Sequence, residues 1–459
     1  MLRPAYVTIT GTDESEIHHS NLRVEKLQCV DEGRDFERVE GDYEELKAKL
    51  QRDDPLEHQK EVHEFLDRTQ ELPLRDDFEY EEPSDLEGIR AERPNGPRQV
   101  VVDIGDEELY DRIYGAWLGR CAGCLLGKPT EGWSSDQMWG YLKDLDRYPL
   151  DDYFRSDVPD EIVERYDLDD YNAYINEVEH MARDDDIDYT VMGLDIVKNH
   201  GIEFDSDDVA MYWLNTIPGC MTYTAERVAY RNFLNLVSPP KSGRFRNPYR
   251  EGIGAQIRAD FYGYVSLGDP EQAAELAWRD ARISHVKSGI YGEMWVAAML
   301  AAAPACTDPR EVIEVGLSEV PENSRFSEAV REVVEWHEEG VGYDEAVDRI
   351  HNRWNDDIDQ IYEWLHTISN AQVVAIGLLY GEDDYGNSIC RAVQPCFDTD
   401  CNGATVGSVV GMMHGADDLP ERWIDPLNDE TETSLSGYPL VDISELAQQT
   451  VDLYREHTA

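Results

Sequence analysis

The spacing of apolar residues predicts a protein built almost entirely from helices. From Asp106 onward, apolar side chains recur every three or four residues, which places them on one face of a helix. Asp269 and Pro270 mark one start clearly, with an N-cap aspartate before a proline at the first helical position. Strand signals are sparse, and no repeat of fixed period is visible. Helices are predicted at Glu107 to Gly127, Thr190 to Asn199, Pro270 to Ser284, Ile290 to Ala303, Glu328 to Glu338, Tyr343 to Asn352, Ile368 to Leu379 and Ala404 to His414.

The first 105 residues have a different character from the rest. They are dense in charge, contain two helical stretches at Tyr43 to Gln51 and Leu56 to Arg68, and end in the proline-rich segment EEPSDLEGIRAERPNGPRQ. We therefore expect residues 1–105 to form an N-terminal extension or small helical subdomain that wraps the rest. Residues 106–459 are expected to form the main domain, a mostly α-helical globule with long functional loops.

Two of the predicted helices carry a glycine at every fourth position. Glycine costs roughly 1 kcal/mol relative to alanine inside a helix, so a whole stripe needs a compensating benefit. Spacing of four aligns the glycines on one face, where another backbone can come close. Glu131 follows the first stripe, and Asp398 and Asp400 precede the second, so close packing of the two helices would bring these carboxylates together. The stripes are Gly115, Gly119, Gly123 and Gly127, and Gly403, Gly407, Gly411 and Gly415.

Composition excludes several classes of partner. The 459 residues include 97 acidic and 41 basic side chains, a net charge of −56, which repels nucleic-acid polymers and anionic membranes. Disorder is excluded because 41% of residues are hydrophobic and 10% aromatic. Only nine of the cations are lysines. This composition is typical of a halophile, since at about 1 M salt a Debye length of about 3 Å screens the self-repulsion.

Location and redox state follow from what the sequence lacks. No signal-peptide pattern and no apolar run of about 18 residues is visible, so a cytoplasmic protein without a membrane span is expected. Eight scattered cysteines are expected to be reduced and mostly buried. Cys121 and Cys124 form a C-x-x-C within the first glycine helix, and packing explains them better than metal or redox chemistry.

Carboxylates held together need a cation, because their repulsion otherwise raises their pKa values. Oxygen donors of this kind suit a hard cation such as Mg²⁺. A second acidic group, the run Asp184, Asp185, Asp186 and Asp188, comes just before Thr190. Acidic pairs occur throughout this chain, so composition alone favours a solvated helix start for this run.

One segment has the opposite charge. Between Lys241 and Arg258 there are five cations and one anion, Glu251, a balance of +4. Gly252 and Gly254 could let backbone N–H groups approach a phosphate there. Salt bridges to neighbouring acids explain the segment equally well. Further on, His285 lies between two helices, where a lone histidine is more often a packed or capping residue than a catalyst.

The motifs in their order resemble the ADP-ribosylglycohydrolase family. The resemblance rests on DRIYGAWLGRCAGCLLGKPTE, the acidic run before a helix, GIGAQIRAD, SHVKSGIYGE and DTDCNGATVGSVVG, and it covers roughly Asp106 to Leu419. It implies a compact orthogonal helical bundle, a centre of two Mg²⁺ ions, with Mn²⁺ or Ca²⁺ as other possibilities, and a substrate bearing ADP-ribose or a related riboside.

The resemblance also implies roles for individual residues. Glu131 and Asp398 are expected to be catalytic. Asp398 and Asp400 match the two aspartates of the family's D-T-D-T motif, while Cys401 replaces its last threonine. The family's T-D-D-T motif is altered: aligned on Thr190 it retains only Asp188, and aligned on the acidic run it retains Asp184 to Asp186. The expected metal ligands are Asp185, Asp186, Asp188, Asp398, Asp400 and Cys401, and the expected substrate-binding residues are Gly127, Arg250, Gly252, Gly254, Arg258, His285, Ser288 and Gly289.

The expected function is therefore Mg²⁺-dependent hydrolysis of a glycosidic bond to ribose in an ADP-ribosylated substrate or related ADP-ribose derivative. Two alternatives stay open. The departures from the two aspartate motifs and the N-terminal extension favour a branch that acts on a smaller nucleoside or N-riboside. The fold can also persist as a catalytically silent, metal-binding structural or binding protein.

Overall fold

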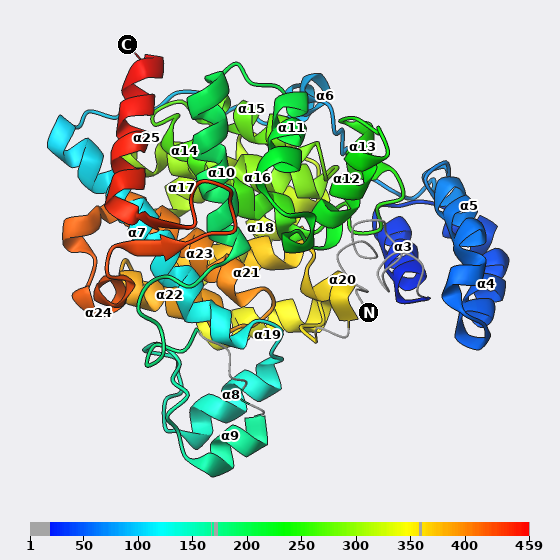
Figure 1. Ribbon diagram of the computed structural model, residues 1–459, viewed down its shortest axis with the longest axis horizontal. Helices are drawn as coiled ribbons and strands as arrows, with labels where there is room; N and C mark the ends of the chain where they lie inside the picture. Colours follow the sequence, from blue (N-terminus) through cyan, green and yellow to red (C-terminus); the bar gives the residue numbers. More distant parts are fainter. Residues whose placement is uncertain (1–18, 167, 169–172, 358–359, 459) are drawn as a thin grey trace.

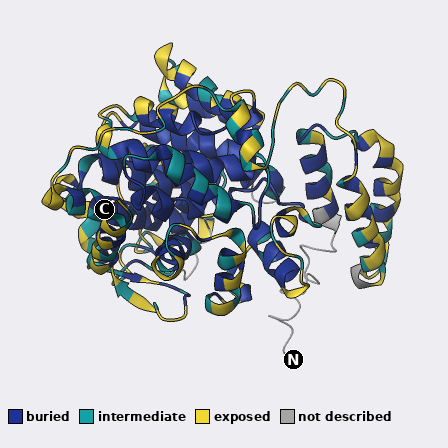
Figure 2. Cartoon of the chain, turned by 90° about the horizontal axis from the view of Figure 1, so that it is seen from above, coloured by how far each residue is buried: buried dark blue, intermediate teal, exposed yellow. Residues whose placement is uncertain are grey.

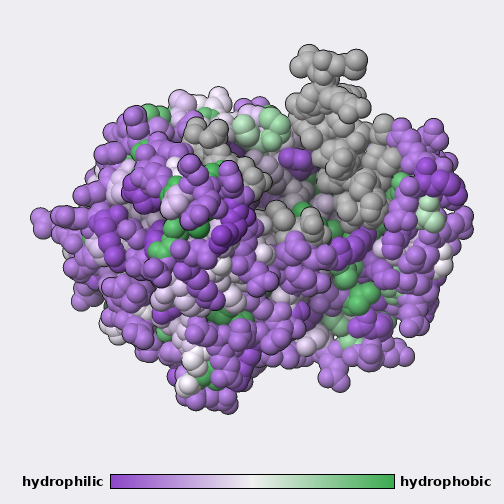
Figure 3. Space-filling view, turned by 90° about the horizontal axis from the view of Figure 1, so that it is seen from below, coloured by the Kyte–Doolittle hydropathy of each residue, from purple (hydrophilic) through white to green (hydrophobic). Residues whose placement is uncertain are grey.

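The computed structural model describes residues 19–166, 168, 173–357 and 360–458. In these ranges the protein is a bundle of packed helices with a single two-stranded sheet (Figure 1). The all-α prediction is therefore confirmed. None of the described helices combines the length and apolar character needed to cross a bilayer. Figure 3 shows hydrophilic residues over most of the face seen from below.

The helices fall into an N-terminal group and a main group. The N-terminal group is α3 (His19–Asp31), α4 (Glu40–Arg52), α5 (Gln59–Thr69) and α6 (Leu86–Glu92). The main group is α7 (Asp106–Gly127), α8 (Ser135–Asp144), α9 (Asp160–Tyr166), α10 (Asp185–His200), α11 (Ser206–Thr216), α12 (Thr224–Leu234), α13 (Lys241–Arg244), α14 (Asp260–Tyr264), α15 (Pro270–Ala281), α16 (Ser288–Ala302), α17 (Pro309–Leu317), α18 (Arg325–Glu338), α19 (Tyr343–Arg353), α20 (Ile361–Trp364), α21 (Thr367–Leu379), α22 (Tyr385–Val393), α23 (Thr399–His414), α24 (Glu421–Ile424) and α25 (Ile443–Thr458).

The eight helices predicted in the main domain are all present, but two begin five residues earlier than their apolar pattern. Helix α10 starts at Asp185 rather than Thr190, and α23 starts at Thr399 rather than Ala404. In both cases the additional residues include aspartates, whose charge suits the positive end of a helix dipole. Of the acidic residues expected to precede these helices, Asp184 and Asp398 are the N-caps and the others lie in the first turns.

Helices α7 and α23 form the centre of the molecule and run antiparallel, with their backbones in contact. A side-chain carbon on Gly119 would meet the carbonyl oxygen of Gly407, and one on Gly407 would meet that of Gly119. The same reciprocal contact joins Gly123 with Gly403, and Gly115 with Gly411. The predicted close approach of the two helices is therefore confirmed, because there is room only for the hydrogen atom of glycine at these positions. At the next step Gly127, the last residue of α7, meets Thr399, the first residue of α23.

The other helices of the main domain surround this pair. Helices α16 and α21 are buried on every side, which fits their apolar sequences. The C-terminal α25 closes against α7, where Trp117 donates a hydrogen bond of 3.1 Å to Thr450. Strands β1 (Glu430–Glu432) and β2 (Leu440–Asp442) pair antiparallel just before α25. Figure 2 shows the buried centre and the exposed outer helices.

Residues from the N-terminal extension have a small core of their own. Leu22 of α3 packs with Phe36, Tyr43 of α4 and Phe65 of α5 in a hydrophobic cluster separate from the main one. Figure 1 shows α4 and α5 standing at the edge of the molecule, with α3 between them and the main domain. Val24 of α3 packs instead against main-domain residues, among them Tyr249.

Buried ion pairs fasten the extension to the main domain. Arg250 is held by Glu25 at 2.7 Å and by Glu32 at 2.6 Å. Arg325 pairs with Glu82 of the extension at 2.8 Å and with Glu251 of its own domain at the same distance. Charges this deeply buried require partners, so the extension supplies part of the electrostatic balance of the main domain.

Replacement of Gly407 by alanine tests the contact between α7 and α23. The added methyl group would enter the carbonyl of Gly119, so the two helices must separate. We expect the free energy of unfolding to fall by at least about 1–3 kcal/mol, the usual cost of an overpacked core. Urea unfolding at constant salt measures the change. Gly41→Ala is the matched control, because a side-chain carbon there meets nothing within 4 Å; an equal loss in both variants would contradict this account.

The ion pairs of Arg250 and Arg325 with the extension form a seam between the extension and the main domain. Replacement of Glu32 by glutamine tests this seam. Burial alone would raise the pKa of Glu32, but the charges of Arg250, Lys287 and Arg34 lower it overall. A lowered pKa stabilises the fold above the unfolded value of 4.5, and this contribution is lost as the pH falls below it. Glu32→Gln leaves Arg250 with one carboxylate, so we expect a loss of about 3–5 kcal/mol at neutral pH.

When the pH is lowered below 4.5, the free energy of unfolding should fall less in Glu32→Gln than in the wild type. The variant already lacks the contribution of the Glu32 carboxylate. Urea unfolding across this pH range measures both effects. Glu57→Gln removes an exposed carboxylate from the same extension and should change neither. A wild-type pH dependence retained by Glu32→Gln would show that Glu32 does not stabilise the seam.

Candidate active site

Three helix ends meet at one point of the main domain. The contact between Gly127 and Thr399 sets the end of α7 beside the start of α23, and the Thr399 hydroxyl donates a hydrogen bond of 2.9 Å to the Gly127 carbonyl. Helix α10 contributes its first turn to the same place. Because α10 and α23 both begin here, their positive dipole ends favour acidic side chains at this point.

The acidic side chains gather at these ends. Ligand atoms of Glu131, Asp398 and Asp400 lie within 4.8 Å of one another, and so do those of Asp186, Asp400 and Cys401. Asp400 belongs to both groups and connects them. Asp398 and Asp400 are buried, whereas Glu131 is exposed at the mouth of the cluster. One oxygen of Asp400 is buried without a hydrogen-bond partner among the described residues.

Crowding and burial make these carboxyl groups hard to ionise. Burial and the charge of Asp184 raise the pKa of Asp400 to about 6 and that of Asp185 to about 8. Burial and Asp400 likewise raise the pKa of Asp398. The charge of Asp400 is the main cause that raises the pKa of Glu131, and the charge of Asp184 adds to it. A cation bound among these oxygens would reverse this effect.

Asp184 and Lys128 are two members of this site that the sequence analysis did not select. Asp184 caps α10, and its carboxylate pairs with the Lys128 ammonium at 2.5 Å. Although burial opposes ionisation of Asp184, the charge and hydrogen bond of Lys128 lower its pKa overall. Lys128 directly follows the first glycine stripe and is one of only nine lysines, which is the signal that could have identified it.

Asp188, one of the expected metal ligands, lies elsewhere. Its carboxylate accepts a hydrogen bond of 2.8 Å from Arg183 and one of 2.7 Å from the backbone N–H of Ser434. Asp188 lies in the first turn of α10, but its carboxylate is held by Arg183 and Ser434 and is not among the groups that approach Asp400. The acidic run therefore faces the cluster through Asp184 and Asp186, with Asp185 half-buried beside them. Asp184, rather than Asp188, lies with Asp186 among these acidic side chains.

The two thiols near the cluster are neutral. Burial and nearby aspartates raise the pKa of Cys401 and of Cys124 well above the usual range. A protonated thiol is a poor ligand for a hard cation. Cys401 lies where it was expected, beside Asp400, but its chemistry suits packing better than ligation.

Arg120 is a further residue that the sequence analysis missed. Its buried guanidinium donates to the backbone carbonyl of Asp186 at 2.8 Å and to that of Ile257 at 2.7 Å, and it pairs with Asp260 at 2.9 Å. Arg120 thus joins α7 and α10 to the 3₁₀ helix η5 (Ile253–Arg258), which carries the expected phosphate-binding segment.

That segment does not present a free anion site. Arg258 is buried and pairs with Asp280, and with Glu226 at 2.7 Å. A side-chain carbon on Gly254 would collide with the carboxylate of Glu226. The basic segment was expected to be either an anion site or a set of salt bridges. Arg258 and Arg250 both form salt bridges, Arg250 with Glu25 of the extension. Gly252 pairs with His366 in an isolated bridge.

The remaining expected substrate residues lie together beside Arg250. His285 is buried and shares a hydrogen bond of 2.8 Å with the hydroxyl of Ser284. A side-chain carbon on Gly289 would meet His285 and the Arg250 carbonyl. The Ser288 hydroxyl and the Nε2 atom of His285 are buried with no hydrogen-bond partner among the described residues.

Comparison with known proteins agrees with the fold and the order of the motifs. The sequence profile of ADP-ribosylglycohydrolase matches residues 105–458. A search of curated proteins gave no significant match. A solved structure titled ADP-ribosylglycohydrolase-related protein complex is similar with a TM-score of 0.50 and 18% identity, covering 76% of this chain and 99% of the other. The chain belongs to the ADP-ribosylglycohydrolase family and is a glycosidase-type hydrolase.

Proposed function

We propose that the protein is an Mg²⁺-dependent hydrolase that cleaves the glycosidic bond of an ADP-ribosylated substrate or related ADP-ribose derivative. The observation that carries the proposal is the meeting of Glu131, Asp398 and Asp400 at the joined ends of α7 and α23. Carboxylates this close are unfavourable without a cation, and an unpartnered oxygen of Asp400 is available to bind one.

The donor set fits a hard divalent cation. The proposed ligands are carboxylate oxygens of Asp184, Asp185, Asp186, Asp398 and Asp400, and oxygen donors of this kind suit Mg²⁺, with Mn²⁺ or Ca²⁺ as substitutes. When bound, the cation would neutralise these charges and act as a Lewis acid toward the ribose end of the substrate. Lys128 already offsets the charge of Asp184 and holds that side chain in place.

Glu131 is the proposed acid–base residue. It is the one exposed member of the cluster, so it can reach both the substrate and water. In a glycosidase, one carboxyl group protonates the leaving atom or removes a proton from the attacking water. Asp398 lies beside Glu131 and would orient it and the reacting groups. Gly127, buried beneath them, keeps α7 close enough to α23 for this arrangement.

The double replacement Asp398→Asn and Asp400→Asn tests the metal site. We expect Mg²⁺ to raise the melting temperature of the wild type and not of this variant, because a ligand that binds only the folded state stabilises it. Hydrolysis of an ADP-ribosylated peptide, assayed in concentrated salt, should fall by at least about 100-fold. Asp417→Asn with Asp418→Asn removes two exposed carboxylates beyond the opposite end of α23 and should change neither.

Glu131→Gln separates chemistry from metal binding. Its turnover should fall far more than the Mg²⁺-induced rise in melting temperature. Full hydrolysis by the Asp398 and Asp400 double variant, with Mg²⁺ stabilisation unchanged, would refute the proposed mechanism.

A smaller nucleoside or N-riboside is a second candidate substrate. It is favoured by the position of Glu226, whose carboxylate lies against Gly254 and pairs with Arg258 where a phosphate was expected. A substrate without phosphates would not compete with that carboxylate. Parallel assays decide the question: we expect a higher kcat/KM on the ADP-ribosyl substrate, and a value at least tenfold higher on a free nucleoside would select the alternative.

A further inference from the structure

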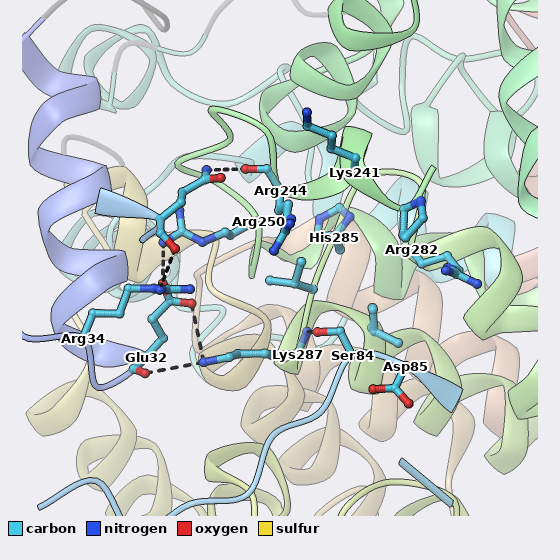
Figure 4. Close-up of a pocket in the computed structure, with 14 residues that line it drawn as sticks. Glu32, Arg34, Ser84, Asp85, Lys241, Arg244, Arg250, Arg282, His285 and Lys287 are labelled. Carbon is cyan, nitrogen blue, oxygen red and sulfur yellow. Dashed lines mark hydrogen bonds and ion pairs between the residues drawn. The ribbon is translucent and has the colours of Figure 1, made fainter. Parts of the chain in front are cut away.

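A pocket of about 370 Å³ lies at the seam between the extension and the main domain (Figure 4). Six cations line it: Arg34, Lys241, Arg244, Arg250, Arg282 and Lys287. Among the described residues, two carboxylates line it with them, Glu32 and Asp85, which leaves a balance of +4. In a protein of net charge −56 such a concentration of cations needs a specific cause.

Three of these cations are already neutralised. Arg250 pairs with Glu25 and Glu32, Arg34 pairs with Glu32, and Lys287 lies 3.5 Å from Glu32. The single carboxylate of Glu32 thus contacts all three cations. They belong to the seam and explain one side of the pocket, seen at the left and bottom of Figure 4.

The other three cations have no such partner. Within the described residues, Lys241, Arg244 and Arg282 make no ion pair. Lys241 and Arg244 are exposed to the pocket and to solvent, and the Lys241 ammonium lies 5.2 Å from the centre of the Phe245 ring. Figure 4 shows Arg244 and Arg282 on either side of His285 at the upper wall of the pocket, with Lys287 opposite.

Arg282 is the most informative of the three. Its guanidinium lies 4.0 Å from the centre of the Trp278 ring, and its Nε atom is buried without a hydrogen-bond partner among the described residues. Burial lowers the pKa of Arg282, and the charge of Asp85 only partly offsets this. Partial burial of a guanidinium with an unused hydrogen-bond donor costs free energy unless an anion accepts that hydrogen bond.

We propose that this pocket binds a phosphate-type anion through Arg244, Arg282 and Lys241. Guanidinium groups bind phosphate oxygens with paired hydrogen bonds, and lysines add charge. The buried Nε2 atom of His285, which lines the same pocket and lacks a partner, offers a further hydrogen bond. The bound anion would also link the extension to the main domain.

The pocket is distinct from the acidic cluster, since the two share no residue. Arg34, Ser84 and Asp85 lie outside residues 105–458, so the pocket requires parts of the chain that the family profile does not cover. The anion has two possible sources, a free phosphate or diphosphate, and the phosphates of a nucleotide such as the substrate. Both present the same chemistry to these side chains.

Calorimetric titration of the full chain with inorganic diphosphate tests the proposal, with no divalent cation added and at constant ionic strength. The double variant Arg244→Gln and Arg282→Gln should bind at least about 10-fold more weakly, since two charge-assisted hydrogen-bonding groups are removed. Arg310→Gln with Arg353→Gln is the control, because it removes two exposed arginines elsewhere and the same charge. Its affinity should equal that of the wild type.

Equal affinity in the wild type and both variants, or no binding by the wild type, would overturn the proposal. The melting temperature without ligand shows whether each variant is folded, and Lys241→Gln gives a second, milder test in which a weaker loss is expected. Competition by ADP-ribose would identify a nucleotide as the source, and absence of competition a free anion.

The Asp398 and Asp400 double variant should still bind diphosphate. Failure of the proposed hydrolysis is therefore distinguishable from failure of this inference.

Discussion

The contact between the backbones of α7 and α23 is the constraint on which the structure depends. Three glycines of each stripe face carbonyl oxygens of the other stripe, so the helix axes come closer than any side chain would allow. This proximity fixes where both helices end. Glu131 and Lys128 follow the end of α7, while Asp398 and Asp400 begin α23. The chemistry of the site therefore rests on a contact made by residues that have no side chains.

Buried charge is handled in two opposite ways in this molecule. The main domain gathers carboxylates at its centre, where Lys128, Arg120 and Arg183 are the cations near them among the described residues. The pKa values of Asp185, Asp398 and Asp400 are raised. At the seam, each buried arginine is surrounded by two or more carboxylates, as Arg250 and Arg325 show. The first arrangement holds more carboxylates than cations, whereas the second balances its charges and joins two parts of the chain.

Much of this could be predicted from the sequence, because local patterns determine it. Periodic apolar residues gave the eight helices, and the glycine spacing gave the contact between α7 and α23, and with it the meeting of Glu131 with Asp398 and Asp400. The place of Asp188 could not be predicted, since one of its partners, the backbone N–H of Ser434, is distant in sequence. The roles of Arg250 and Arg258 could not either. Their partners, Glu25 and Glu226, are distant in sequence, and charge counts do not show which ions meet.

The seam has an evolutionary consequence. Arg250 belongs to the part of the chain shared with the family, but the carboxylates that neutralise it, Glu25 and Glu32, do not. A relative without such an extension cannot keep an arginine buried there uncompensated. The residue at position 250 and the presence of the extension should therefore covary among homologues. The residue found at this position in an alignment of the shared domain would then indicate whether a homologue has the extension.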